Sequence, residues 1–157
     1  MIVHITEAHN DSEWEEAGLR LMKSVVREGS SVLDVGAHLG AHTIPLARAV
    51  GTSGSVIALE PQTALFQLLT ANVAINGLWN TRVLNAAAGD SPDKLLIEAY
   101  ERGELRNYGS ESMKQDGIAN IAVDVITIDS LELPSLDLLK VSPLFFVCVL
   151  QLACQPY

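Results

Sequence analysis

Two acidic residues of this sequence are best placed for chemistry. One lies within a short apolar run, and the other directly follows a second run. The first run, residues 32–35, contains Asp34 and leads into a glycine-containing turn. The second run, residues 55–59, is followed directly by Glu60. A strand, a glycine turn, a helix and a second strand ending in an acid form half of a nucleotide-binding sheet, in which the acid accepts hydrogen bonds from a ribose. We therefore expect Glu60 to bind ribose hydroxyls.

The spacing of the glycines in the first turn indicates the kind of nucleotide. Dinucleotide sites use the pattern G-x-G-x-x-G, which brings backbone amides to a pyrophosphate at the start of a helix. Here Gly36 and Gly40 are separated by three residues, and Asp34 is a poor neighbour for a pyrophosphate. An acid suits a ligand that carries an amino group and a sulfonium. The pattern predicts an S-adenosylmethionine site and disfavours the alternative, an NAD-dependent oxidoreductase.

The length and the net charge of the chain limit the classes of protein to which it can belong. The 157 residues suffice for one domain with a core. Nineteen acidic against ten basic residues give a net charge of −9, which argues against nucleic acid or an anionic membrane as a partner. The N-terminus lacks the basic flank and apolar run of a signal peptide, so we expect a cytoplasmic location. Cys148 and Cys154 lack the spacing of a redox or zinc site, and we expect free thiols.

The elements that must position the two acids follow from hydrophobic periodicity. Residues 94–99 and 121–128 alternate between apolar and other residues, so we expect an antiparallel flap, with a polar loop at 101–117 between its strands. The order of helices and strands predicts an α/β fold, a parallel sheet with helices on both faces. The expected helices are residues 13–27, 39–50 and 62–75, and the expected strands of the main sheet are residues 32–35, 55–59, 82–86 and 136–141.

The composition of the chain changes after Lys140. No residue from 141 to 157 is charged, whereas ~25% of the residues in a typical domain are. The apolar run at 144–150 is shorter than the ~20 residues that span a bilayer. We therefore expect a cofactor-binding domain at 1–140 and a separate apolar tail at 141–157.

The order and spacing of several motifs resemble the FkbM-type S-adenosylmethionine-dependent methyltransferases. The resemblance implies a Rossmann-like sheet with its strands in the order third, second, first, fourth. Members of that family continue the fourth strand as Lys-Ile-Asp-Val-Glu-Gly, whereas this chain has Val-Ser-Pro after Lys140, so we expect the second half of the sheet to be missing. Two explanations of the departure after Lys140 are open. The segment could be read from an unspliced intron, or it could be a frameshift or a divergent end. The motifs are residues 13–16, 34–43, 59–61, 72–77, 85–90, 107–109 with Ser112, 127–131 and 136–140.

The resemblance implies a role for each part of the cofactor site. Asp34 would lie near the amino group of the methionine part, directly or through water, and Gly36 would let the backbone approach the ligand because it has no Cβ. His38 would offer its main chain, while a catalytic or metal role for the pair His38 and His42 is the alternative. Asp90 would accept the adenine amino group or act as a turn residue. The implied cofactor-binding residues are Asp34, Gly36, Ala37, His38, Gly40, Glu60, Pro61, Ala87, Ala88 and Asp90.

The implied reaction is methyl transfer from S-adenosylmethionine to a hydroxyl of a small molecule or sugar. The adenine would lie against Pro61, Ala87 and Ala88, and the loop at 101–117 would handle the acceptor. An alcohol acceptor needs a base or metal to take its proton, and the acids that follow Lys140 in the family are absent here. We therefore assign no catalytic residue and no metal. A non-catalytic cofactor-binding fragment is the alternative function.

Overall fold

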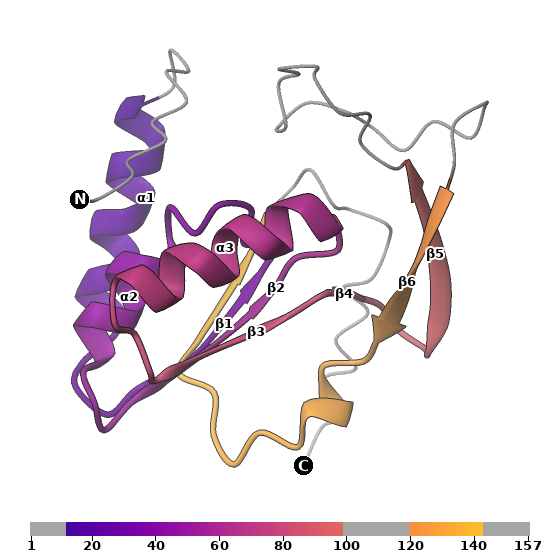
Figure 1. The fold of residues 1–157 in the computed structure, drawn as a ribbon. Coiled ribbons are helices and arrows are strands. Elements are labelled where there is room, and N and C mark those ends of the chain that lie inside the picture. Colours follow the sequence, from indigo (N-terminus) through magenta and orange to yellow (C-terminus); the bar gives the residue numbers. More distant parts are fainter. Residues whose placement is uncertain (1–11, 99–119, 143–157) are drawn as a thin grey trace.

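A four-stranded parallel sheet is the centre of the computed structural model, which describes residues 12–98 and 120–142 (Figure 1). Its strands are β1 (Ser31–Val35), β2 (Ser55–Leu59), β3 (Thr81–Leu84) and β7 (Leu138–Val141). They lie in the order β3-β2-β1-β7, and each neighbouring pair is parallel. The predicted strand order is confirmed. The carboxyl ends of all four strands therefore meet at one edge of the sheet.

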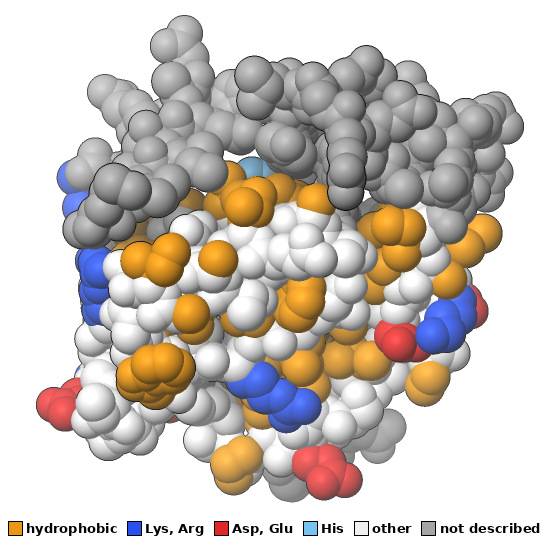
Figure 2. Space-filling view, in the orientation of Figure 1, with side chains coloured by type: hydrophobic (Ala, Val, Ile, Leu, Met, Phe, Trp, Pro, Cys, Tyr) orange, Lys and Arg blue, Asp and Glu red, His pale blue; other side chains and the backbone are white. Residues whose placement is uncertain are grey.

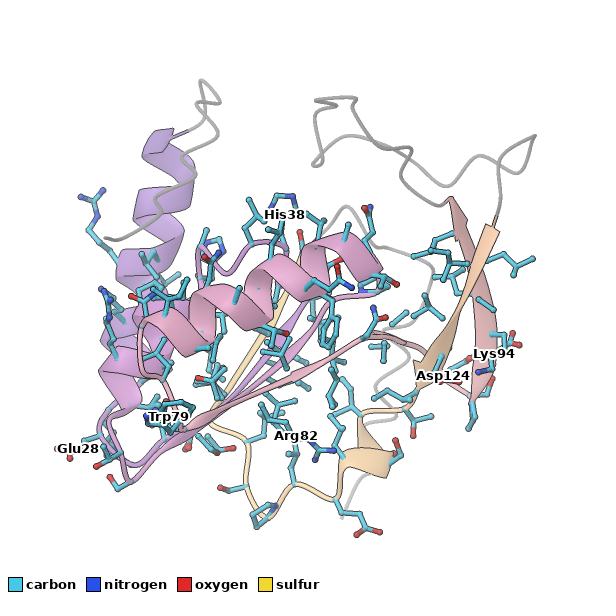
Figure 3. The ribbon with its side chains drawn as sticks, in the orientation of Figure 1. Glu28, His38, Trp79, Arg82, Lys94 and Asp124 are labelled. Carbon is cyan, nitrogen blue, oxygen red and sulfur yellow. The ribbon has the colours of Figure 1, made fainter. Side chains whose placement is uncertain are left out.

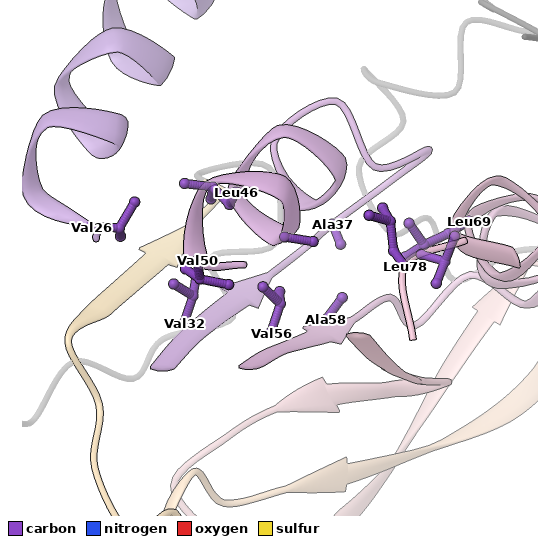
Figure 4. Packing of buried hydrophobic residues seen from close by; sticks show 11 residues of the cluster. Val26, Val32, Ala37, Leu46, Val50, Val56, Ala58, Leu69 and Leu78 are labelled. Carbon is purple, nitrogen blue, oxygen red and sulfur yellow. The ribbon is translucent and has the colours of Figure 1, made fainter. Parts of the chain in front are cut away.

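Three α-helices contribute to the core on one face of this sheet. They are α1 (Ser12–Val25), α2 (Thr43–Val50) and α3 (Thr63–Ile75). Val32 of β1 and Val56 of β2 meet Leu46 of α2 and Leu69 of α3, and all four side chains are at most 2% exposed (Figure 4). Burying each such side chain is worth about 1.5–3 kcal/mol, so this face anchors the helices to the sheet.

The opposite face of the sheet has a second apolar cluster. Side chains alternate between the two faces of a strand, so Leu33 and Val35 point away from Val32. They pack with Leu59, and the partly buried side chains around them include Leu131 of the 3-10 helix η1 (Asp129–Leu131). Among residues 12–98 and 120–142, this second cluster receives side chains from η1 and its flanks but none from an α-helix.

A second sheet has three strands: β4 (Ala86–Ala88), β5 (Asp93–Glu98) and β6 (Asn120–Ile126). β5 and β6 pair antiparallel, which confirms the predicted flap (Figure 1). β4 pairs parallel with β6, a pairing that the sequence did not suggest. The strand expected at residues 82–86 is therefore divided at Asn85 between the two sheets.

The second helix begins later than expected. We predicted a start at residue 39, whereas α2 begins at Thr43. Gly36, His38 and Gly40 have positive φ angles of 74°, 52° and 95°, in the left-handed region that a right-handed helix does not use. The residues after β1 therefore form a tight loop before the helix starts.

Several predictions concern residues outside the described ranges. These are the loop at 101–117, and the part of the apolar tail from residue 143, which holds both cysteines.

No helix within residues 12–98 and 120–142 has the length and apolar character that a membrane span requires. Exposed apolar side chains such as Trp79, Leu21 and Leu96 come from different elements, and on the face shown in Figure 2 apolar side chains form separate groups.

Candidate functional site

The loop that follows β1 folds back onto the end of β2. The backbone N–H groups of Gly36 and Ala37 both donate to the carbonyl of Leu59, at 2.9 and 3.0 Å. The N–H of Gly40 donates to the carbonyl of Ala37 at 2.9 Å. His38 lies on this loop, beyond the ends of β1 and β2 (Figure 3). The amides at the start of the loop therefore have partners within the protein.

Two features of the loop favour glycine at position 40. Its φ of 95° belongs to the left-handed region, and a Cβ built there would lie 2.7 Å from Leu69 Cδ1. A residue with a Cβ at this position would therefore adopt a strained backbone and would require the end of the Leu69 side chain to shift.

Glu60 connects the loop to the end of β2. Its Oε2 accepts the N–H of His38 at 2.8 Å, and its Oε1 accepts the N–H of Gln62 at 2.9 Å. Glu60 follows the end of β2 directly, as expected, and its side chain is fully buried. The two backbone amides satisfy the carboxylate and so make its burial possible.

Burial also changes the acidity of Glu60. It raises the pKa of this carboxyl from 4.5 to about 7, because burial disfavours the charged form. The hydrogen bonds from Gln62 and His38 and the charge of Lys140 lower the pKa in part, and the negative charge of Asp34 raises it. Protonated and ionised Glu60 are therefore both present near neutral pH.

Asp34 and Lys140 form a buried ion pair between neighbouring strands. They face each other in the register of β1 and β7, and Leu33, Val35, Leu139 and Val141 point to the opposite face. The alternation along each strand thus puts both charged side chains on the face that carries the helices. Lys140 Nζ lies 2.9 Å from Asp34 Oδ1.

Two further contacts fix this pair. The hydroxyl of Thr43, at the start of α2, donates to Asp34 Oδ2 at 2.6 Å. Lys140 Nζ donates to the carbonyl of Gly36 at 3.0 Å. Asp34 Oδ1 is buried and has no aligned hydrogen bond, so its contact with Lys140 is a contact between charges.

Sequence reasoning missed Lys140 and Thr43. A signal was present for Lys140: a lysine within an apolar strand is buried only with a partner, and Asp34 is the acid in the neighbouring strand. Thr43 gave no comparable signal, because its contact with Asp34 depends on where α2 begins.

Asn85 holds the backbone that follows Glu60. Its side-chain amide donates to the carbonyls of Glu60 and Pro61, at 2.9 and 2.8 Å, and its Oδ1 accepts the hydroxyl of Thr63 at 3.1 Å. The residue between the two sheets thereby fixes the turn from β2 into α3.

The family of the chain follows from a comparison with family models. The model of the FkbM methyltransferase domain matches residues 34–141, which is more than half of the chain. The chain belongs to this family. The match begins at Asp34 and ends just after Lys140, so this FkbM domain contains both residues of the buried ion pair. No curated protein matches the chain.

Solved structures of methyltransferases resemble parts of this FkbM domain. A SAM-dependent O-methyltransferase from Thermotoga maritima is 25% identical, with a TM-score of 0.43, over 55% of this chain and 37% of that one. A SAM-dependent methyltransferase from Aquifex aeolicus is 26% identical, with a TM-score of 0.40, over 49% and 47% of the two chains. A putative rRNA methylase from Clostridium thermocellum is 21% identical, with a TM-score of 0.43, over 53% and 45%. The chain thus spans about half or less of these proteins.

The residues expected at the cofactor site fall into two groups in this FkbM domain. Direct contacts join the loop residues and the two acids into one cluster, and Asn85 ties Pro61 to it. Ala87 and Ala88 lie in β4, in the second sheet. Asp90 is exposed in the turn after β4 and accepts the hydroxyl of Ser91 at 3.1 Å, as a turn residue does. Within the described ranges, no group of three or more His, Cys, Asp or Glu side chains could hold a metal ion.

Proposed function

We propose that this domain binds S-adenosylmethionine at the loop after β1 and transfers its methyl group to a hydroxyl of a small molecule or sugar. One observation carries the proposal. The amides of Gly36, Ala37 and His38 donate to the end of β2, two to the carbonyl of Leu59 and one to the carboxylate of Glu60. They are therefore not available to a pyrophosphate, which a dinucleotide site has to bind.

The acids near this loop suit a cationic ligand. S-Adenosylmethionine carries a sulfonium and an ammonium, and both are attracted by Asp34 and by ionised Glu60. Each carboxylate oxygen of Glu60 accepts one backbone amide and keeps a lone pair for a ribose hydroxyl.

We propose the remaining cofactor contacts from where the expected residues lie in the fold. The left-handed residues Gly36 and Gly40, with Ala37 and His38 between them, let the backbone approach the methionine part. The adenine would lie near Pro61, whose carbonyl Asn85 holds. Contacts from Ala87, Ala88 and Asp90 would come from β4 and the turn after it.

The bound cofactor would supply an activated methyl group, and the protein would align the acceptor with it.

The second candidate function is a domain that binds the cofactor but does not transfer its methyl group. The segment after Lys140 favours it, because Ser142 stands where the family resemblance implies an acid. Both candidates share the same cofactor site, so a methyl-transfer assay with hydroxyl acceptors separates them.

Titration calorimetry with three ligands tests the cofactor assignment. We expect S-adenosylmethionine and S-adenosylhomocysteine to bind and NAD not to bind. Binding of NAD alone would identify a dinucleotide site and overturn the proposal.

A further inference from the structure

The accessible part of the buried ion pair belongs to Lys140. The side chain of Asp34 is fully buried, whereas that of Lys140 is 14% exposed. An ammonium group has three N–H donors. In Lys140 one of them donates to the carbonyl of Gly36, and Asp34 Oδ1 lies 2.9 Å from the same nitrogen. Of the two paired side chains, only that of Lys140 is therefore partly exposed.

The ammonium of Lys140 is held at the loop before any ligand arrives. Asp34 is itself fixed by the hydroxyl of Thr43 at 2.6 Å. The carbonyl of Gly36, at the start of the loop after β1, is the second fixed partner of Lys140. A lysine that is already ordered loses little further side-chain entropy when it binds an anion.

Stability alone is a weak reason for this pair. Replacing a buried ion pair by apolar side chains of similar size is often neutral or stabilising. The pair lies instead where the loop after β1 meets the carboxyl ends of the strands, which is where a parallel sheet binds its ligands. A pre-ordered lysine at this edge, whose side chain is partly exposed and keeps an N–H donor beyond its two contacts, fits an anionic group on the ligand.

We propose that Lys140 binds the α-carboxylate of the cofactor's amino-acid part and that Asp34 is the positioning residue that holds Lys140 in place. This inference rests on the proposed function. The zwitterionic end of S-adenosylmethionine would place its carboxylate at Lys140 and its ammonium toward the negative charges of Asp34 and Glu60. Lys140 would thereby select ligands that carry a free amino acid over nucleosides that lack one.

The test uses S-adenosylhomocysteine and its carboxamide, which keeps the ammonium but has no carboxylate charge. The wild-type protein should bind S-adenosylhomocysteine about tenfold or more tightly than the carboxamide, as expected for a hydrogen bond between charged groups. In Lys140→Met this preference should disappear. Lys94→Met is the matched control, because Lys94 pairs with Asp124 on the second sheet, where both side chains are 63% exposed (Figure 3). It should keep the wild-type preference.

A double variant separates ligand binding from folding. Lys140→Met alone leaves the buried charge of Asp34 without its cationic partner, so Asp34→Asn with Lys140→Met removes both charges together. We expect the double variant to fold and to bind both ligands about equally. If Lys140 only neutralises Asp34, the double variant will keep the wild-type preference, and that result overturns the inference. A wild-type protein that binds neither ligand would instead contradict the proposed function, and the inference with it.

Discussion

The backbone N–H of His38 donates to the carboxylate of Glu60 at 2.8 Å, which joins the loop after β1 to the end of β2. The carboxylate is fully buried and also accepts the N–H of Gln62. One side chain therefore sets the shape of the loop and carries a proton that titrates near neutral pH. The first two predictions follow from this double role.

The stability of the domain should depend on the protonation of Glu60. Its pKa is about 7 in the folded protein and 4.5 without burial, so between these values the folded state binds more protons than the unfolded state. The contribution of Glu60 to the free energy of unfolding is therefore largest below pH 4.5 and falls, by about 3 kcal/mol in total, as the pH rises through 7. Urea unfolding at pH 5 and pH 8 measures this, with Glu60→Gln as a variant whose stability should change less. Equal pH dependence in the two proteins would contradict the assignment.

Ligand binding should show the opposite dependence on pH. Ribose hydroxyls donate hydrogen bonds, which favours ionised Glu60. The affinity for 5′-methylthioadenosine, which has the ribose but no amino acid, should therefore rise about tenfold from pH 6 to pH 8. In Glu60→Gln the affinity should not change over this range. Calorimetry at several pH values tests this, and a pH-independent wild-type affinity would exclude ionised Glu60 from the ribose site.

Gly40→Ala should destabilise the domain more than Gly77→Ala. Both glycines have positive φ, 95° and 65°, so an alanine is strained by about 1–2 kcal/mol at either position. Only at Gly40 would the new Cβ meet a neighbour, Leu69 Cδ1 at 2.7 Å, whereas at Gly77 nothing lies within 4 Å. The overpacking should add about 1–3 kcal/mol to the loss in Gly40→Ala. Thermal and urea unfolding of the two variants measure the difference, and equal losses would show that Leu69 moves freely.

Asn85→Ala should weaken cofactor binding as well as the fold. It removes three hydrogen bonds, two donated to the carbonyls of Glu60 and Pro61 and one accepted from the hydroxyl of Thr63, and should lower the free energy of unfolding by about 1–3 kcal/mol. Asn80→Ala is the control, because Asn80 also donates to two carbonyls, those of Ala47 and Gly51. Asn80→Ala should lose similar stability but bind S-adenosylhomocysteine like the wild type. Equal affinities in both variants would mean that Asn85 has a role in folding alone.

The main sheet could be predicted because its signals are local. The apolar run at 55–59 corresponds to β2, and the periodicity at 62–75 corresponds to α3, which begins at Thr63. The start of α2 could not be predicted in the same way. It depends on the left-handed conformation of His38, which histidine adopts more often than most residues but which is uncommon for any residue other than glycine.

The chemistry of the site was only partly visible in the sequence. Asp34 and Glu60 stood out because an acid next to an apolar run is unusual. Their burial and their partners depend on contacts between distant segments, such as that of Asp34 with Lys140. The division of the expected strand at Asn85 likewise depends on the pairing of β4 with β6.

The most direct test of the central claim is a two-dimensional NMR spectrum of backbone amides recorded while S-adenosylhomocysteine is added. Ligand at the loop after β1 should shift the amide signals of Gly36, His38 and Gly40 and that of Glu60. The signals of Leu96 and Val123, in the second sheet, should change little. Unchanged loop signals together with large shifts in β5 and β6 would place the ligand elsewhere and contradict the account.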